Sequence, residues 1–440
     1  MYRKLRDLEV NSLKKFSAIT TSDSNHTLDG INPRELLMVS EAIKMGHSDE
    51  AKKYWTKIAH NHADLAIVLS DYFKPLVSSI RSTKNAATIF SSLPNTGAAY
   101  TNSTMEFDFL QYGMIPSGGL SFSLAQTPWF LGEFLSLTGR KISGQNILFS
   151  GLAKRWISPE AFSFMEVTSE HKLEVSEKDA TGLISEHYLE PPKDWVLKPF
   201  IPVINDVFSS DSVDEIMKNL SQLSLNSSDQ DIRSFAKECE ERMRIMPSPL
   251  ALQITNLLIK KSRKILTSTF NEIVEEQGND TAQFIQNRKR LKQQYITKPS
   301  LIQSLTTEVR ANINMMEKDG EISKNIYLKI LGNQPPQEPF NNSELSRALD
   351  QAIEIVDTPI DEEFIYHDRS DFTLSAHPKL RKFHPDFNFK TGLDHDPLYM
   401  QKEVIRWSDT YLDTERDSLR SIVSGIPLQD LKRQEHLFSW

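Results

Sequence analysis

Residues 107–160 read FDFLQYGMIPSGGLSFSLAQTPWFLGEFLSLTGRKISGQNILFSGLAKRWISPE and carry the clearest structural signals of the chain. Met105–Phe109 alternates apolar and acidic residues, which predicts a strand with one exposed face. A helix is predicted through Phe130–Leu137, because Gly139 directly after it suits a left-handed cap. Another helix is expected from Ser143 to Phe149. Between strand and helix, glycine and proline mark a loop, at Gly113, Pro116, Gly118 and Gly119.

The flanking sequence alternates short apolar runs with amphipathic helices. Phe16–Thr20 and Leu76–Ile80 are expected to be strands, with a second element at Ala86–Phe90. A buried stripe predicts a helix over Asp49–Phe73, which Lys74-Pro75 ends. Four more helical patterns are found, at Glu35–Met45, Asp211–Leu220, Ser228–Met246 and Pro249–Glu276. The front of the chain is therefore α/β and the rear mostly helical.

The last hundred residues differ in character. Asn333–Pro339 reads NQPPQEP, and Ser370–Tyr399 combines scattered aromatic residues with three prolines, at Pro378, Pro385 and Pro397. A final helix is predicted over Met400–Val423. Low regularity with many aromatic residues predicts an extension that lies along another molecule.

The composition limits the class of protein. The chain has 440 residues, of which 39% are hydrophobic and 25% charged, as in folded proteins. A net charge of −8 argues against a surface that binds nucleic acid as a whole, so any RNA contact is expected to be local. Cys239 is the single cysteine, which excludes an internal disulfide and fits a reducing or matrix-like compartment. No apolar run reaches the ~20 residues of a membrane span.

Several motifs in order resemble the 3-hydroxyisobutyryl-CoA hydrolase branch of the enoyl-CoA hydratase/isomerase (crotonase) superfamily. They are a Gly-x-x-Pro loop, a Leu-Gly-x-x-Leu-x-Leu-Thr-Gly helix and a Gly-Leu-Ala turn, found here at Gly113–Pro116, Leu131–Gly139 and Gly151–Ala153. The likeness covers roughly residues 16–285. It implies an α/β crotonase-like spiral of ββα units, N-terminally shortened, with a helical C-terminal region and a long irregular extension.

This resemblance also implies a division of the chain into three parts. Residues 1–285 would form a degenerate crotonase-like domain, and residues 286–332 a helical extension. Residues 333–440 would be an irregular extension rich in proline and aromatic residues that ends in a helix.

The catalytic groups of that family are missing at their expected places. The family uses a Glu four residues before the loop glycine and an Asp four residues after it; here those positions hold Phe109 and Ser117. Phenylalanine cannot transfer a proton, and serine needs a neighbouring base to attack a thioester. The segment that aligns with the family's Gly-Gly-Gly oxyanion site carries Ala86 and Ala87, whose β-carbons narrow the approach of a thioester. We therefore expect no catalysis, no cofactor and no CoA binding.

Other constellations give weaker signals. His60 and His62 are two residues apart on a predicted helix and cannot face one metal ion, so no metal site is expected. The chain has no phosphate-binding glycine loop of the GxGxxG or GxxxxGK[ST] type. Two basic runs are candidates for local RNA contact, although each is also compatible with a solvated helix face: Lys260, Lys261, Arg263 and Lys264 in one, and Arg288, Lys289, Arg290 and Lys292 in the other.

A scaffold that has lost its catalytic groups and gained a long tail is typical of a protein retained for binding. The family resemblance implies a non-catalytic structural protein of the mitochondrial ribosome's small subunit, in the mitochondrial matrix. Its partners would be other ribosomal proteins, contacted through the C-terminal extension, with local rRNA contact. Two alternatives stay open: an acyl-CoA-binding pseudoenzyme that regulates branched-chain amino-acid breakdown, and a hydrolase with relocated catalytic residues.

Overall fold

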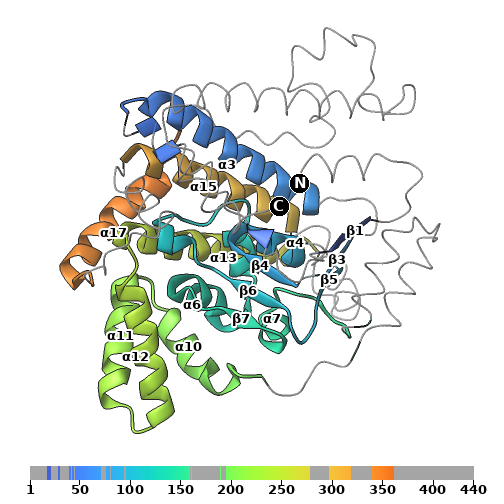
Figure 1. The fold of residues 1–440 in the computed structure, drawn as a ribbon, viewed down its shortest axis with the longest axis vertical. Coiled ribbons are helices and arrows are strands. Elements are labelled where there is room, and N and C mark those ends of the chain that lie inside the picture. The colour runs from blue at the N-terminus through green and yellow to red at the C-terminus, as the bar shows by residue number, and fades with distance from the viewer. Residues whose placement is uncertain are drawn as a thin grey trace, which may run out of the picture.

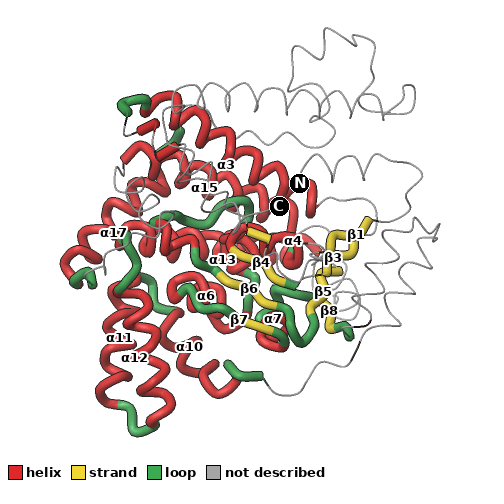
Figure 2. Tube along the Cα trace, viewed as in Figure 1, coloured by secondary structure: helices red, strands yellow, loops and turns green. Residues whose placement is uncertain are grey.

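Two small sheets and a thick helical cover make up the molecule (Figures 1 and 2). The computed structural model describes residues 17–20, 28–29, 39–40, 42–43, 45–70, 76–79, 81–93, 96–158, 160, 189, 195–277, 297–318 and 339–360. Within these ranges no helix is long and apolar enough to cross a membrane. The expected helix Met400–Val423, the loop-like Ser370–Tyr399 and the basic run at 288–292 lie outside them.

Each sheet has four strands, and nearly all neighbours run parallel. The first sheet has the order β1-β3-β5-β8, from β1 (Ser17–Thr20), β3 (Leu76–Ser79), β5 (Thr96–Ala99) and β8 (Arg155–Trp156). The second has the order β2-β4-β6-β7, from β2 (Leu28–Asp29), β4 (Ser82–Lys84), β6 (Thr104–Glu106) and β7 (Ile142–Ser143). Only the β6–β7 pair is antiparallel among these. From β1 to β6, successive strands along the chain alternate between the sheets, which is the repeating pattern expected of the spiral.

Short helices connect the strands and surround the candidate site. They are η1 (Asn85–Thr88), α4 (Ile89–Ser92), η2 (Phe109–Tyr112), α5 (Leu120–Ala125), η3 (Pro128–Phe130), α6 (Leu131–Thr138) and α7 (Gln145–Phe149). Helix α6 ends at Gly139 in the left-handed conformation, with φ of 59°, as its sequence predicts.

Three long helices from distant parts of the chain cover these elements. They are α3 (Ser48–Ser70), α13 (Pro249–Gln277) and α15 (Thr297–Lys318), and α3 and α15 lie side by side at the top of Figure 1. Helix α17 (Asn342–Asp357) packs against α13 and α15, and its Ile355 is fully buried in the main core. The helices after residue 285 thus share a hydrophobic core with the front of the chain.

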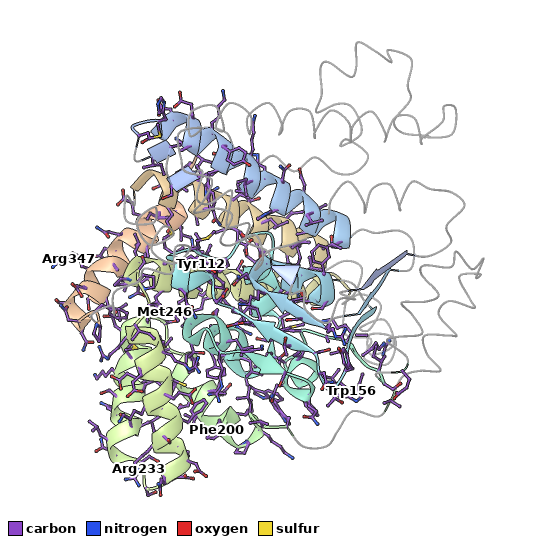
Figure 3. The ribbon with its side chains drawn as sticks, in the orientation of Figure 1. Tyr112, Trp156, Phe200, Arg233, Met246 and Arg347 are labelled. Carbon is purple, nitrogen blue, oxygen red and sulfur yellow. The ribbon has the colours of Figure 1, made fainter. Side chains whose placement is uncertain are left out.

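A helical hairpin projects from the body. The short η4 (Lys198–Phe200) leads into α10 (Ile201–Phe208), and α11 (Val213–Asn226) then pairs with α12 (Gln230–Arg244). Figure 3 places Met246 where the hairpin meets the body and Arg233 toward its far end. Ser212 and Asp229 cap the two helices through side-chain oxygens that accept backbone N–H bonds.

The predicted elements and the structure differ at one strand and at several helices. Strand β6 ends at Glu106, so Phe109 lies in the 3-10 helix η2 and the predicted strand Met105–Phe109 is too long. The alternating pattern gave the wrong extent because Asp108 is buried and hydrogen-bonded rather than solvent-facing. Helices α10 and α17 were not predicted. The region that contains α17 was expected to be irregular.

Candidate functional site

Phe109 occupies the position that the family resemblance assigns to a catalytic Glu. Its side chain is 1% exposed and belongs to the main hydrophobic core, beside residues of η2 and α5. Its backbone N–H donates to Asn85 Oδ1 at 2.9 Å. A buried phenyl ring at this point can position neighbours by packing, but it offers no group that exchanges protons.

Two carboxylates lie near Phe109 in the sequence, those of Glu106 and Asp108, and both are paired with other side chains. Asp108 accepts a hydrogen bond from Asn85 Nδ2 at 2.7 Å, and Lys84 Nζ lies 3.1 Å from both Asp108 and Glu106. Burial alone would lower the pKa of Lys84, but these two carboxylates outweigh that effect and raise it. Lys84 therefore stays charged, and the cluster fixes the backbone between β4 and η2.

The segment aligned with the family's oxyanion glycines is filled with packed side chains. Ala86, Ala87 and Thr88 form η1 and are all buried. The methyl group of Ala87 joins a hydrophobic cluster with Phe122 of α5, Leu305 of α15 and Ala63 of α3. Backbone N–H groups remain in this segment, but an apolar cluster covers the approach that a thioester would need.

Ser117 occupies the position that the family resemblance assigns to a catalytic Asp. Its Oγ lies 3.4 Å from Nδ1 of His62, which α3 brings to the loop from 55 residues away. Burial lowers the pKa of His62 to about 4, so this ring is neutral at physiological pH. A long Ser–His contact with a weakly basic ring is a poor arrangement for activating a nucleophile.

The two glycines after Ser117 allow the covering helices to approach the loop closely. Gly118 and Gly119 both adopt the left-handed region, with φ of 64° and 86°. A β-carbon added at Gly118 would lie 3.1 Å from His62 Cβ, and one at Gly119 would lie 3.2 Å from Ala66 Cβ. Helix α3 thus packs directly on the loop that carries Ser117.

Helix α15 fixes the same loop by hydrogen bonds. The buried carboxylate of Glu308 accepts the N–H of Gly119 at 2.7 Å and that of Ser121 at 2.6 Å. Asn312, one turn further along, donates to the carbonyl of Pro116 at 2.9 Å. Burial raises the pKa of Glu308, and the hydrogen bonds to Ser121 and Gly119 oppose that effect.

Glu308 and Asn312 were not identified from the sequence, although one signal existed. Both stand on the buried stripe of α15, beside Leu305, Val309 and Ile313. A polar residue on an otherwise apolar stripe requires a buried partner. Their partner is the loop at 116–121, which thereby becomes an internal packing surface.

Helix α13 presents the first basic run, but most of its charges meet partners within the chain. Arg263 pairs with the fully buried Glu133 through two nitrogens, at 2.7 and 3.1 Å. Lys260 donates to the carbonyl of Ser209, and Lys261 pairs with Asp357. Only Lys264 of the four is exposed, while the second run lies outside the described residues. RNA contact through these two runs stays a prediction.

No metal centre is evident in the described ranges, where no three His, Cys, Asp or Glu side chains gather around a common point. Cys239 is buried, and this burial raises the pKa of its thiol to about 12, with Arg140 opposing the effect and Glu238 adding to it. The thiol is therefore inert at physiological pH.

Comparisons with known proteins agree with this architecture. The sequence model of the enoyl-CoA hydratase/isomerase family matches residues 102–321, half of the chain. A carnitinyl-CoA dehydratase from Mycobacterium thermoresistibile has a similar fold, with a TM-score of 0.60 and 16% identity over 83% of this chain and 89% of that one. An enoyl-CoA hydratase from Rhodobacter sphaeroides gives a TM-score of 0.54 at 13% identity, over 79% of this chain and 96% of that one.

Three curated relatives are more similar in sequence. "Small ribosomal subunit protein mS47" of Arabidopsis thaliana is 25% identical over 52% of this chain and 54% of its own. The mitochondrial 3-hydroxyisobutyryl-CoA hydrolase-like protein 1 of the same plant is 29% identical over 44% of this chain and 48% of its own. The human mitochondrial 3-hydroxyisobutyryl-CoA hydrolase is 28% identical over 35% of this chain and 39% of its own. The match thus spans about half, or less, of the length of these relatives. With half of its length matched by the family's sequence model, the chain belongs to the enoyl-CoA hydratase/isomerase family.

Proposed function

We propose that this chain is a non-catalytic structural component of the small subunit of the mitochondrial ribosome, built on a 3-hydroxyisobutyryl-CoA hydrolase-like scaffold. The observation that carries the proposal is the state of the Ser117 loop. Glu308, Asn312 and His62 hold this loop against α15 and α3. A site closed by its own helices is suited to packing rather than turnover.

The replacement of the two carboxylates supports the absence of catalysis. Phe109 is buried in the core, and Ser117 is left with His62, whose lowered pKa makes it a weak base. Losing general acid–base assistance alone removes about 10²–10⁴ in rate. The closed loop adds a steric obstacle to this chemical one.

The relatives support the cellular setting. One is named a small ribosomal subunit protein, and the hydrolase relatives are named mitochondrial. We place the chain in the mitochondrial matrix, where its extension at 333–440 would contact neighbouring ribosomal proteins. We also propose the division of the chain into residues 1–285, 286–332 and 333–440, although α15 and α17 pack on the front of the chain.

One contact favours a second candidate, a hydrolase with relocated catalytic residues. Ser117 Oγ and His62 Nδ1 are neighbours, as in a nucleophile–base pair. Their 3.4 Å separation and the lowered pKa of His62 argue against it. An acyl-CoA sensor is supported by no contact in the described residues.

Sedimentation tests the proposal directly. Mitochondrial lysate is separated on a sucrose gradient, and the chain is detected against small-subunit rRNA, before and after subunit dissociation. We expect co-migration with the small subunit that persists at moderate salt. Recovery only in the light fractions would overturn the ribosomal proposal.

Thioester hydrolysis by the purified chain separates the candidates. We expect no hydrolysis of 3-hydroxyisobutyryl-CoA above the rate without protein, and no change with Ser117→Ala. Hydrolysis that Ser117→Ala and His62→Ala both abolish would establish the relocated hydrolase instead. Tight acyl-CoA binding without hydrolysis would favour the sensor.

A further inference from the structure

The turn between α5 and α6 has a strained backbone at two aromatic residues. Trp129 and Phe130 adopt the left-handed region, with φ of 52° and 56°. Bulky side chains rarely adopt it, and such conformations persist only where the surroundings enforce them. Trp129 is nevertheless 47% exposed, so packing of its own ring does not explain the strain. The left-handed backbone leaves the indole of Trp129 half-exposed to solvent.

Helix α13 and the turn's own side chains hold this conformation. Arg263 donates to the carbonyl of Thr127 at 3.1 Å and lies over the Phe130 ring, 4.8 Å from its centroid. Thr127 Oγ1 accepts the N–H of Gly132 at 2.6 Å. Arg263 also pairs with Glu133, in the first turn of α6, which directly follows the turn. The turn is therefore rigid and keeps Trp129 in place.

Trp129 ends a row of three aromatic rings. Phe149 and Trp195 are stacked at 5.1 Å with an interplanar angle of 23°, and Trp195 and Trp129 lie 6.3 Å apart at 32°. A hydrogen bond from Leu197 N–H to Asn146 Oδ1 holds the Trp195 segment on α7. We call the three rings the aromatic row.

Exposed lysines border the row. Lys198 follows Trp195 by one turn, its N–H donating to the Trp195 carbonyl, and Lys154 donates through Nζ to the carbonyl of Gly151, two residues after Phe149. Lys264 stands one helical turn after Lys260, which lies 5.7 Å from the Phe130 centroid. Among the described residues, Glu133 is paired with Arg263, and the exposed Asp211 lies 3.8 Å from Lys260.

From this geometry we propose that the aromatic row is a platform on which unpaired bases of single-stranded RNA stack. A stacked pair of rings followed by a tilted, half-exposed indole can accept a further planar ring, and every nucleobase has one. The bordering lysines suit the phosphates of the same strand. The inference rests on the proposed function, since it names the rRNA contact of that ribosomal component.

Charge favours RNA over a protein partner for this surface. Exposed hydrophobic residues alone, including Val196 at 67% exposure beside Trp195, would fit either. Exposed Lys198 stands one turn after Trp195, however, and exposed Lys154 five residues after Phe149, within a chain of net charge −8. A local cluster of cations on an acidic body is the arrangement expected of a short RNA contact.

Fluorescence anisotropy of labelled oligo(U) and oligo(A) RNA, titrated with the purified full chain at low and raised salt, tests the platform. We expect saturable binding that weakens with salt, and a loss of roughly tenfold or more with Trp129→Leu. Trp129→Phe, which retains a stackable ring, should retain most of the affinity. Lys264→Gln should weaken binding and reduce the salt dependence, whereas Lys218→Gln on α11 should change neither.

The outcomes separate this platform from the ribosomal proposal. No RNA binding by the unmodified chain at low salt, or equal binding by Trp129→Leu, would overturn the platform. Equal loss with Leu225→Ala, an exposed residue on the hairpin, would also overturn it, because the loss would not be specific to the row. Co-sedimentation with the small subunit that survives Trp129→Leu would leave the ribosomal proposal standing while the platform failed.

Discussion

Two turns flank α5, and the C-terminal helices fix both in opposite ways. The turn before α5 uses Gly118 and Gly119 in the left-handed region and is closed over by α3 and α15. The turn after α5 puts Trp129 and Phe130 in the same region and leaves Trp129 exposed. In the first turn, glycine adopts the left-handed region without strain and permits close packing. In the second turn, the left-handed backbone of the aromatic residues is strained, and Trp129 is exposed. The turn before α5 is therefore interior, and the turn after α5 is on the surface.

The largest effect should come from breaking the ion pair beneath the second turn. Arg263→Ala leaves Glu133 fully buried without its partner, which costs about 3–5 kcal/mol of unfolding free energy. Denaturant unfolding followed by circular dichroism measures it. Arg242→Ala, which removes a half-exposed pair with Glu238, should cost only about 0.5 kcal/mol. Similar costs for the two variants would contradict a rigidly anchored turn.

Removing the carboxylate that closes the first turn should be the next largest effect. Glu308→Ala leaves the N–H groups of Gly119 and Ser121 unsatisfied in the interior, at a cost of about 3 kcal/mol. Glu344→Ala is the matched control, because Glu344 accepts a backbone N–H in an exposed capping box on α17. That variant should lose about 1 kcal/mol. If Glu344→Ala cost more, the closed loop would not depend on α15.

Glu308 also predicts a dependence of stability on pH. Burial raises its pKa in the folded chain above the ordinary value of 4.5, so folding favours the protonated form. Its contribution is complete below that ordinary value and is lost as pH rises through the raised pKa. Glu308→Gln should therefore remove this decline, which unfolding measured at several pH values would detect. An unchanged pH profile in Glu308→Gln would show that other groups cause it.

Two glycines have nearly the same φ but different surroundings, so substitutions at both can separate the cost of backbone strain from the cost of packing. Gly119 has φ of 86° and a β-carbon there would meet Ala66, whereas Gly46 has φ of 87° and open space around it. Ala at either position pays about 1–2 kcal/mol for the left-handed backbone. Gly119→Ala should cost about 1 kcal/mol more by thermal unfolding, since its neighbours must also move. Equal costs would mean that α3 does not press on the loop.

The smallest expected effect is a difference in stability between two variants of Trp129. Trp129→Gly relieves the left-handed strain and should be about 1 kcal/mol more stable than Trp129→Ala, which retains that strain. Chemical denaturation of both variants makes the comparison, and both should lose RNA affinity. A Gly variant no more stable than the Ala variant would place the strain elsewhere.

The sequence predicted the local elements well, because their signals are local. The helix before Gly139 and the helices α3, α12 and α13 follow from apolar spacing and flanking caps. The family resemblance, rather than any pattern, predicted the spiral of ββα units. Phe109 was placed on a strand because the burial of Asp108 cannot be read from alternation.

From the sequence, only the missing catalytic carboxylates of the candidate site could be predicted. Phe109 and Ser117 could be identified as non-carboxylate positions, but their surroundings could not. Glu308 and Asn312 act on a loop almost two hundred residues earlier, and no local pattern pairs them. The left-handed Trp129 was also invisible, since the sequence Pro-Trp-Phe carries no glycine to mark it.

The hydrogen bonds of Glu308 join residues 187 and 189 positions apart, which fixes the order in which the molecule can be completed. During synthesis or import, the front of the chain emerges long before Thr297–Lys318. The loop at 116–121 must therefore wait, its N–H groups bonded to water, until the last long helix arrives. The loop at 116–121 is therefore among the last parts of this chain to reach its final structure.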